Sequence, residues 1–286
     1  MQIAVASGKG GTGKTTVSVN LFHYFNNMAG IKTLLVDCDV EEPNALFFIK
    51  LKQLKYERPV YRLVPDIDIN ACTFCKKCSE WCAFNAITII ASQKIAEVHN
   101  DLCHSCGACL EACKENAISE FPSLLGHLSC YVVEPDSEFI EGRLKIGSSL
   151  QTMLIKQVKE AVPNDYSIIL FDAPPGTSCP VVQTISGTDY VIVVTEPTPF
   201  GLHDLKLTVE VIKQLSIPFG VIINKADYGT TEVKEYLKLN EICLLGEIPF
   251  SKEYAQAYSN GDILDDIPLE ILSIYRQIAN EILTFA

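Results

Sequence analysis

Short runs of apolar residues recur along most of the chain, and longer amphipathic stretches separate them. Six such runs are rich in Val and Ile and occupy residues 3–6, 33–37, 167–172, 190–194, 219–224 and 242–248. They do not alternate with polar residues, which is typical of strands buried on both faces of a parallel sheet. Between them lie helical patterns such as 148–162, where Leu150, Leu154 and Val158 share one face. Strands that alternate with helices predict an α/β fold with a doubly wound, mostly parallel sheet.

This alternation stops between about residue 60 and residue 123. The segment carries cysteines, short polar turns and two Asn-Ala-Ile triplets, with no convincing long helix and no buried strand run. Because a structureless loop of this length is uncommon inside a compact domain, we expect a small inserted domain over residues 63–123. Residues 1–62 and 124–286 would then form the α/β domain around it.

The overall composition is that of an ordinary globular protein, with 286 residues, 48% hydrophobic and 20% charged. A formal net charge of -12 argues against nucleic acid as a partner, since binding to its backbone relies on Lys and Arg. The first apolar run is short and leads into a glycine-rich loop, and no window approaches the roughly 20 apolar residues that span a bilayer. We therefore expect a cytoplasmic protein.

The cysteines change this picture. There are twelve of them, and in a reducing compartment they favour metal or redox cofactors over disulfides. Eight form two runs of the pattern C-x2-C-x2-C-x3-C, and the second run lies 31 residues after the first. The triplet 85–87 recurs at 116–118 with the same shift, so the segment is an internal duplication. The first run holds Cys72, Cys75, Cys78 and Cys82, and the second holds Cys103, Cys106, Cys109 and Cys113.

This spacing resembles that of the two-cluster bacterial ferredoxins, in which the fourth cysteine of a run binds the other cluster. The resemblance implies a small α+β ferredoxin-like insert with two [4Fe–4S] clusters. The implied ligands are Cys72, Cys75, Cys78 and Cys113 for the first cluster, and Cys103, Cys106, Cys109 and Cys82 for the second. Two zinc sites are the alternative, which is disfavoured because structural zinc usually takes two well-separated C-x2-C pairs. Ala83 and Lys114 stand where ferredoxins often have Pro, so the local backbone and the reduction potential can differ.

The glycine-rich loop GKGGTGKT (8–15) fits the phosphate-binding pattern G-x-x-x-x-G-K-[ST]. It follows an apolar run and precedes a helical stretch, which is the context in which this loop holds phosphates. Lys14 is expected to reach the β- and γ-phosphates of a nucleotide, and Thr15 to ligate Mg²⁺. The residues expected to hold the nucleotide here are Gly8, Gly10, Gly11, Thr12, Gly13, Lys14, Thr15 and Thr16.

Lys9 is a second lysine within the loop, and it makes the loop similar to the deviant Walker A loop of the MinD/ParA/Mrp ATPase superfamily. Residues 34–44 resemble switch I of that superfamily, and residues 170–180 resemble its D-x-P-P-G switch II. The resemblance implies an ATP-dependent dimer in which Lys9 contacts the nucleotide of the partner. It also implies that Asp39 orients the attacking water or the magnesium shell, and that Asp172 holds Mg²⁺ through water.

Asn224 opens the tetrapeptide NKAD, which by itself resembles the guanine-reading motif of GTPases. In MinD-type proteins the asparagine at this place contacts adenine, so the resemblance implies ATP, with Asn224 beside the base. Cys179 lies seven residues after Asp172, where nitrogenase iron protein keeps a cluster cysteine. No secure second cysteine accompanies Cys179 in this sequence. Whether Cys179 has a redox role is left open.

These features together predict a P-loop ATPase with an inserted ferredoxin domain, acting as a homodimer or as a heterodimer with a paralogous ATPase. The leading hypothesis is that ATP hydrolysis is coupled to electron transfer or partner docking through the clusters. Residues 65–125 contain eight acids and four bases, which suits a basic redox partner and is equally consistent with a solvated surface that has no partner. Two alternatives stay open: an Mrp-like carrier that assembles iron–sulfur clusters, and a MinD/ParA-like positioning switch with a redox-sensing insert. Residues 268–286 contain one basic residue, Arg276, so we expect a packed helix and no membrane anchor.

Overall fold

The computed structural model describes the whole chain except residues 51, 134–136, 264–266 and 286. It divides into two compact units, which are described separately. The sheet unit comprises residues 1–58, 128–143 and 152–286, and the cysteine unit comprises residues 59–127 and 144–151. All of the expected insert, 63–123, lies in the cysteine unit.

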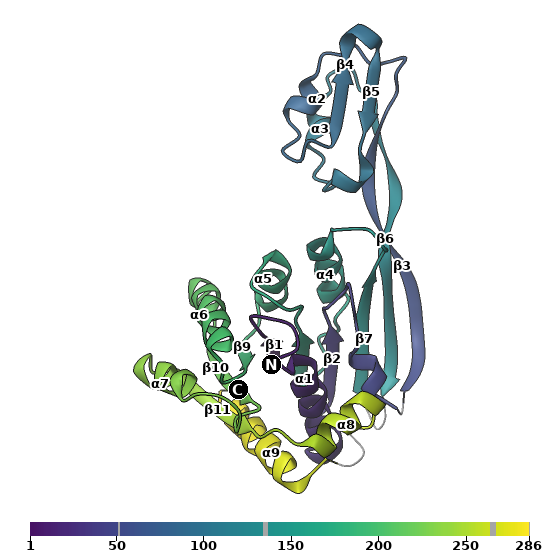
Figure 1. Cartoon of the computed structure of the whole chain (residues 1–286). Helices are drawn as coiled ribbons and strands as arrows, with labels where there is room; N and C mark the ends of the chain where they lie inside the picture. The colour runs from purple at the N-terminus through teal and green to yellow at the C-terminus, as the bar shows by residue number, and fades with distance from the viewer. Residues whose placement is uncertain (51, 134–136, 264–266, 286) are drawn as a thin grey trace. The chain divides into compact units, whose positions relative to one another are not determined.

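A nine-stranded sheet organises the sheet unit, in the order β11-β10-β9-β1-β8-β2-β7-β6-β3 (Figure 1). Its strands are β1 (Gln2–Ala6), β2 (Thr33–Asp37), β3 (Lys52–Ile67), β6 (Ile118–Val133), β7 (Ser137–Leu144), β8 (Ile168–Asp172), β9 (Tyr190–Thr195), β10 (Phe219–Asn224) and β11 (Cys243–Ile248). Neighbouring strands from β11 to β7 pair in parallel. In the centre, Ala4 of β1 lies opposite Phe171 on one side and Val191 on the other.

Each of the six apolar runs forms a strand of this sheet, within one residue of the expected bounds. Every residue of β2, β8 and β9 is buried, which explains why these strands show no polar alternation. The expected α/β fold with a large, mostly parallel sheet is therefore confirmed.

Helices cover both faces of the sheet (Figure 1). They are α1 (Lys14–His23), α4 (Gln151–Glu160), α5 (Cys179–Ile185), α6 (Pro199–Gln214), α7 (Glu232–Leu239), α8 (Lys252–Asn260) and α9 (Leu269–Leu283), with short helical turns η1 (Tyr24–Met28) and η2 (Ala45–Phe48). One face carries a continuous core in which Ile3 and Val5 of β1 pack with α1 and α9. On the other face, α4 lies so close to β7 that a side chain at Gly142 would meet Val158.

The C-terminal helix α9 packs into the core, as the sequence predicted. Its residues Tyr275, Ile278 and Ile282 are buried against the sheet, while Leu272 is only half-buried. None of the helices in the described part of the chain has the length and apolar character needed to cross a membrane.

The cysteine unit contains strands, although no buried apolar run marks them in the sequence between residues 60 and 123. β3 and β6 run into this segment from both sides, and Pro65 and Pro122 lie inside them. Most residues in the first half of β3 are exposed, so no apolar run marks the strand. Two short antiparallel strands, β4 (Ile87–Ile90) and β5 (Ile95–Val98), complete the unit. Its helical segments are α2 (Lys77–Glu80), α3 (Ala108–Ala112), η3 (Ala91–Gln93) and η4 (Asn100–Leu102).

The burial of Phe139 on β7 gives a direct test of the sheet packing. Phe139→Ala should lower the free energy of unfolding by about 3–5 kcal/mol, because the change removes buried apolar surface and leaves a cavity. Phe200→Ala on α6 is the matched control, since that side chain is 77% exposed and its loss should cost less than about 0.5 kcal/mol. Urea denaturation followed by circular dichroism measures both, and equal losses would contradict the assigned burial.

Candidate functional site

The candidate nucleotide site is formed by segments that follow five neighbouring strands of the sheet, and it includes Glu196 and Asp37, which the sequence did not assign to it. In spatial order they are Asn224 at the end of β10, Glu196 after β9, the loop 7–13 after β1, Asp172 at the end of β8 and Asp37 at the end of β2. The carboxyl ends of parallel strands meet at one edge of a sheet, and ligands bind there in doubly wound folds. The sheet topology therefore brings these segments together.

The loop 7–13 has the backbone of a phosphate-binding loop. Gly13 has a φ of 92°, and any side chain there would also collide with the amide of Asn224. A side chain at Gly8 would approach the carbonyl oxygen of Asp204 to 2.6 Å. Helix α1 begins directly after the loop, at Lys14, so its first N–H groups and its dipole favour an anion at this point.

Asp172 is the centre of the site. Lys14 Nζ donates to Asp172 Oδ1 at 2.8 Å, and Thr15 Oγ1 donates to Oδ2 at 2.8 Å. Ser18 Oγ, one turn after Lys14 on α1, also donates to Oδ1 at 2.8 Å. The structure therefore places Lys14, Thr15 and Asp172 together. Ser18 was missed by the sequence reasoning, although its i+4 spacing from Lys14 puts both on one helix face.

The charges of this group depend on one another. Burial by itself would lower the pKa of Lys14, but the Asp172 carboxylate raises it above its ordinary value. The Lys14 side chain and Asp172 are both buried, so removal of either partner would leave an unpaired charge in the interior. A nucleotide phosphate would offer Lys14 a second anionic partner at this position.

Asp37 fixes the segment that follows β2. Its carboxylate accepts hydrogen bonds from the backbone N–H groups of Asp39, Asn44 and Ala45, at 3.0–3.1 Å. Burial raises the pKa of Asp37, and the neighbouring Asp172 carboxylate raises it further, to about 7. The sequence marked Asp37 only as the end of a strand, so this anchoring role was not foreseen.

Asp39 lies half-buried on the segment that Asp37 anchors. Burial raises the pKa of Asp39, and the nearby Lys14 opposes this increase. Asp39 is thus close enough to Lys14 to interact with its charge. Its expected role toward an attacking water stays a prediction.

Asn224 lines a cavity beside the phosphate loop. Its Nδ2 donates to the carbonyl oxygen of Thr12 at 2.7 Å, and its Oδ1 accepts from the N–H of Lys225 at 3.0 Å. The cavity encloses about 840 Å³ including its open mouth, and its other walls include the aromatic residues Phe250, Tyr254, Tyr258 and Tyr275. Aromatic walls with a few polar groups suit a planar base. The amide of Asn224 supports the loop here, and its expected contact with adenine stays a prediction.

Lys9 lies at the edge of the site and pairs within its own chain. Its Nζ is 3.1 Å from Glu196 Oε2, and Lys225 Nζ is 2.6 Å from Glu196 Oε1. Burial would raise the pKa of Glu196, but the two lysines lower it below its ordinary value. The expected contact of Lys9 with the nucleotide of a partner chain stays a prediction.

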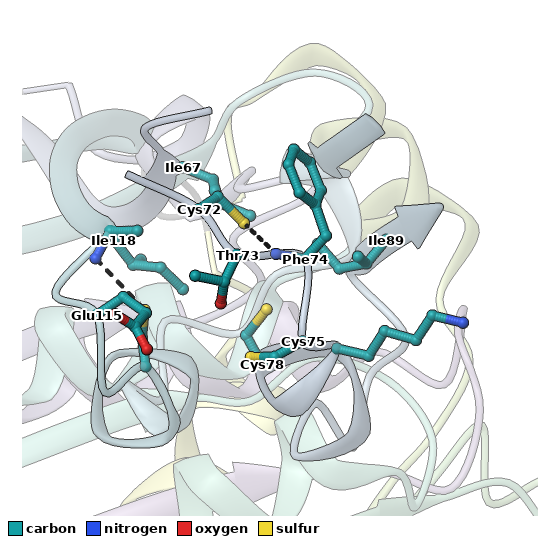
Figure 2. A pocket seen from close by; sticks show the side chains of 12 residues that line it. Ile67, Cys72, Thr73, Phe74, Cys75, Cys78, Ile89, Glu115 and Ile118 are labelled. Carbon is teal, nitrogen blue, oxygen red and sulfur yellow. Dashed lines mark hydrogen bonds between the residues drawn. The ribbon is translucent and has the colours of Figure 1, made fainter. Parts of the chain in front are cut away.

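The eight duplicated cysteines line two cavities of the cysteine unit. The first cavity is lined by Cys72, Cys75, Cys78 and Cys113. The second cavity is lined by Cys82, Cys103, Cys106 and Cys109. They enclose about 340 and 370 Å³ of space, partly open to solvent. Each cavity therefore combines three cysteines of one repeat with the fourth cysteine of the other. Figure 2 shows the first cavity, with Cys72, Cys75 and Cys78 from one repeat and Glu115 and Ile118 from the other.

The backbone around the two cavities repeats with the same shift of 31 residues. Four N–H groups donate to cysteine sulfurs at 3.3–3.4 Å: those of Phe74 to Cys72, Ser105 to Cys103, Ala86 to Cys82 and Ala117 to Cys113. The pairs Phe74 and Ser105, and Asn85 and Asn116, have φ values of 52–55°. Non-glycine residues in this left-handed region are strained, and such strain gathers at functional sites. Backbone N–H groups that donate to sulfur are typical of the shell that orients the ligands of a metal centre.

Three of the thiols that line the cavities are buried, those of Cys78, Cys103 and Cys109. Burial raises the pKa of Cys78, and it raises the pKa of Cys109 to about 11. Metal binding would therefore release protons from these thiols. Within the described ranges, no three His, Cys, Asp or Glu side chains converge on a point that could hold a single metal ion. The four thiolates of a [4Fe–4S] cluster each bind a different iron atom. Ligands of a cluster therefore surround a cavity and do not converge on one point.

The remaining four cysteines lie in the sheet unit. Cys38 and Cys130 are buried, and Cys243 is half-buried. Cys179 is exposed at the first position of α5.

The raised pKa of Asp37 predicts a dependence of stability on pH. Between its ordinary pKa of 3.8 and its folded pKa of about 7, only the unfolded state is ionised. The free energy of unfolding should therefore fall as the pH rises through this range, by on the order of 1 kcal/mol per pH unit, and level off above pH 7. The Asp37→Asn variant has no carboxyl group at this position and should not show this loss. The difference in free energy of unfolding between the variant and the unchanged protein should therefore shift in favour of the variant from pH 5 to pH 7. Urea denaturation without nucleotide measures the difference, and a difference independent of pH would contradict the assignment.

Comparisons with known proteins agree with the fold and with the phosphate loop. Residues 3–264 match the family described as the CobQ/CobB/MinD/ParA nucleotide binding domain. An uncharacterised protein of Methanocaldococcus jannaschii is 32% identical over 268 residues, which cover 92% of this chain and 90% of that protein. An iron-sulfur cluster carrier protein of Pyrococcus furiosus is 25% identical over 231 residues, covering 79% of this chain and 62% of that protein.

Among solved structures, the septum site-determining protein MinD of Pyrococcus horikoshii, complexed with Mg-ADP, has the same fold. The TM-score is 0.59 at 18% sequence identity, and the match covers 98% of this chain and 95% of that one. The structural likeness shows the fold, and the family match extends over most of the chain. This chain therefore belongs to the CobQ/CobB/MinD/ParA family of nucleotide-binding domains.

Proposed function

We propose that this protein is an ATP-hydrolysing iron–sulfur protein in which the nucleotide state controls electron transfer or partner docking through two [4Fe–4S] clusters. The observation that carries the proposal is the sorting of eight cysteines into two cavities, each lined by three thiols of one repeat and one of the other. This is the ligand pattern of two-cluster ferredoxins. Each cluster would take up and release one electron at a time.

The chain supplies most of the groups that ATP hydrolysis requires. Lys14 carries the charge that would neutralise the phosphates, and the N–H groups of the loop and of α1 add donors. The Thr15 hydroxyl and the Asp172 carboxylate lie 2.8 Å apart and would hold Mg²⁺, which neutralises developing charge on the phosphates. Asp39 is the candidate for positioning water. Lys9 would complete the site of a second copy or of a paralogous ATPase, as the expected dimer requires.

A continuous stretch of backbone provides a physical route between nucleotide and cysteines. Three backbone N–H groups of the segment 38–45 donate hydrogen bonds to the carboxylate of Asp37. The short helix η2 begins at the end of this segment, at Ala45. β3 then begins at Lys52 in the sheet unit and ends at Ile67 in the cysteine unit. The proposed coupling is that a movement of the segment 38–45 on ATP binding is passed along the chain toward the first cysteine run.

A cluster carrier is the second candidate, and the name of the Pyrococcus furiosus relative favours it. A carrier must release its cluster to an acceptor, whereas a redox protein keeps it. Cys75 and Cys106 are exposed, but Cys78, Cys103 and Cys109 are buried. The buried ligands favour retention. Anaerobic incubation with an apo-ferredoxin, with and without ATP, separates the candidates: iron that stays with this chain supports the redox role, and ATP-dependent transfer supports the carrier role.

The crossed ligand sets predict an unusual pattern in double variants. Cys72→Ser with Cys113→Ser removes two ligands of one proposed cluster, so anaerobically reconstituted protein should keep about half of its iron. Cys72→Ser with Cys82→Ser is the matched control, because it removes one ligand from each cluster and should deplete both. Iron analysis measures the outcome. The reverse pattern would show that each run binds its own cluster and would overturn the crossed assignment.

Coupling to ATP predicts a nucleotide-dependent rate of electron transfer. The reduced protein is mixed anaerobically with oxidised cytochrome c, a basic acceptor that suits the excess of acids over bases in residues 65–125. Mg-ATP should change the rate several-fold, and Lys14→Ala should abolish the change because the variant cannot hold the phosphates.

Lys156→Ala is the matched control, since Lys156 is exposed on α4 and its variant should keep the response to ATP. Stopped-flow absorbance gives the rates. Equal rates with and without Mg-ATP in the unchanged protein would contradict the proposed coupling.

A further inference from the structure

The two cysteine cavities have the same backbone but different linings. Position for position across the shift of 31 residues, Phe74 in the first cavity corresponds to Ser105 in the second. Thr73 and Glu115 of the first cavity correspond to His104 and Phe84 of the second, whose rings stack 3.8 Å apart at 11°. The duplication has therefore produced two sites of similar shape and different chemistry.

Ser105 carries a hydroxyl that lacks a partner. Its Oγ is buried and finds no hydrogen-bond acceptor or donor within the part of the chain that the structure describes. The same residue lines the second cavity, and its backbone N–H already donates to Cys103 Sγ at 3.4 Å. An unpaired buried hydroxyl is destabilising, so the native protein is expected to supply an acceptor. The sulfur atoms of a cluster in this cavity are such acceptors.

We propose that the Ser105 hydroxyl donates a hydrogen bond to a sulfur of the second cluster and raises the reduction potential of that cluster. This inference rests on the proposed binding of [4Fe–4S] clusters. Reduction adds one electron, from [4Fe–4S]²⁺ to [4Fe–4S]⁺, and so increases the negative charge on the sulfurs. A donor at sulfur stabilises the reduced form more than the oxidised form. Phe74, at the equivalent place in the first cavity, has no side-chain donor.

The charged residues that line the two cavities do not consistently favour reduction of one cluster over the other. Lys76 and Glu115 line the first cavity, whereas Glu120 lines the second and has the apolar Ile89 as its counterpart. A comparison of the two clusters with each other would therefore mix several effects. Each cluster is better compared with itself, before and after a change at Ser105 or Phe74.

The test is a reductive titration of the full-length, anaerobically reconstituted protein with dithionite, followed by electron paramagnetic resonance. Ser105→Ala should make the reduction equilibrium of one of the two couples about tenfold less favourable, a shift of about 59 mV to more negative potential for a one-electron couple. The other couple should not move. Phe74→Ser introduces the donor into the first cavity and should shift the other couple in the opposite direction.

Two further variants separate the hydrogen bond from a structural effect. Ser105→Gly removes the same hydroxyl and tolerates the left-handed backbone, with φ of 53°, so it should reproduce the shift. Ser92→Ala, at an exposed serine of η3, should leave both couples unchanged.

Unshifted couples in both Ser105 variants, with iron contents equal to that of the unchanged protein, would overturn the inference. Loss of half of the iron in both Ser105 variants would also overturn it, because Ser105 would then serve cluster assembly. An unchanged protein that binds no iron would refute the proposed function itself, and this inference with it.

Discussion

The buried carboxylate of Asp172 is the interaction on which the nucleotide site depends. It lies at the end of β8, the strand next to β1, and accepts hydrogen bonds from Lys14, Thr15 and Ser18. Because the carboxylate and the ammonium of Lys14 are both buried, each charge is stable only in the presence of the other. The pair thereby fixes the start of α1 against the carboxyl edge of the sheet. It also influences Asp37, whose pKa rises partly because Asp172 is negative. An incoming phosphate and Mg²⁺ would meet a site whose parts are already linked.

Much of the sheet could be predicted because strands that are buried on both faces appear in the sequence as uninterrupted apolar runs. Runs such as 33–37 and 190–194 contain only residues that the finished sheet covers almost completely. β7 was missed because Glu138, Glu141 and Arg143 interrupt its apolar residues. Glu141 is nevertheless buried, and burial raises its pKa above its ordinary value. β3 was missed for the opposite reason, since most of its side chains are exposed.

The parts of the candidate site that could be predicted from the sequence are those whose motifs have a fixed spacing. The loop 8–15 and the cysteine runs specify neighbours along the chain, and the resemblance of these runs to two-cluster ferredoxins implied the crossed ligand sets. Ser18, Glu196 and Ser105 could not be assigned in this way. The partners of Ser18 and Glu196 are distant in sequence, and the Ser105 hydroxyl has no partner among the described residues, so only the folded structure shows what surrounds each side chain.

The central claim is that the two cavities hold [4Fe–4S] clusters, which would place a redox centre on a chain whose nucleotide site is built for phosphates. The most direct measurement is the content of iron, acid-labile sulfide and zinc in protein purified without oxygen, together with the number of unpaired spins after reduction. The account predicts about eight iron and eight sulfide per chain, and about two spins after complete reduction. About two zinc ions per chain with no sulfide would contradict it.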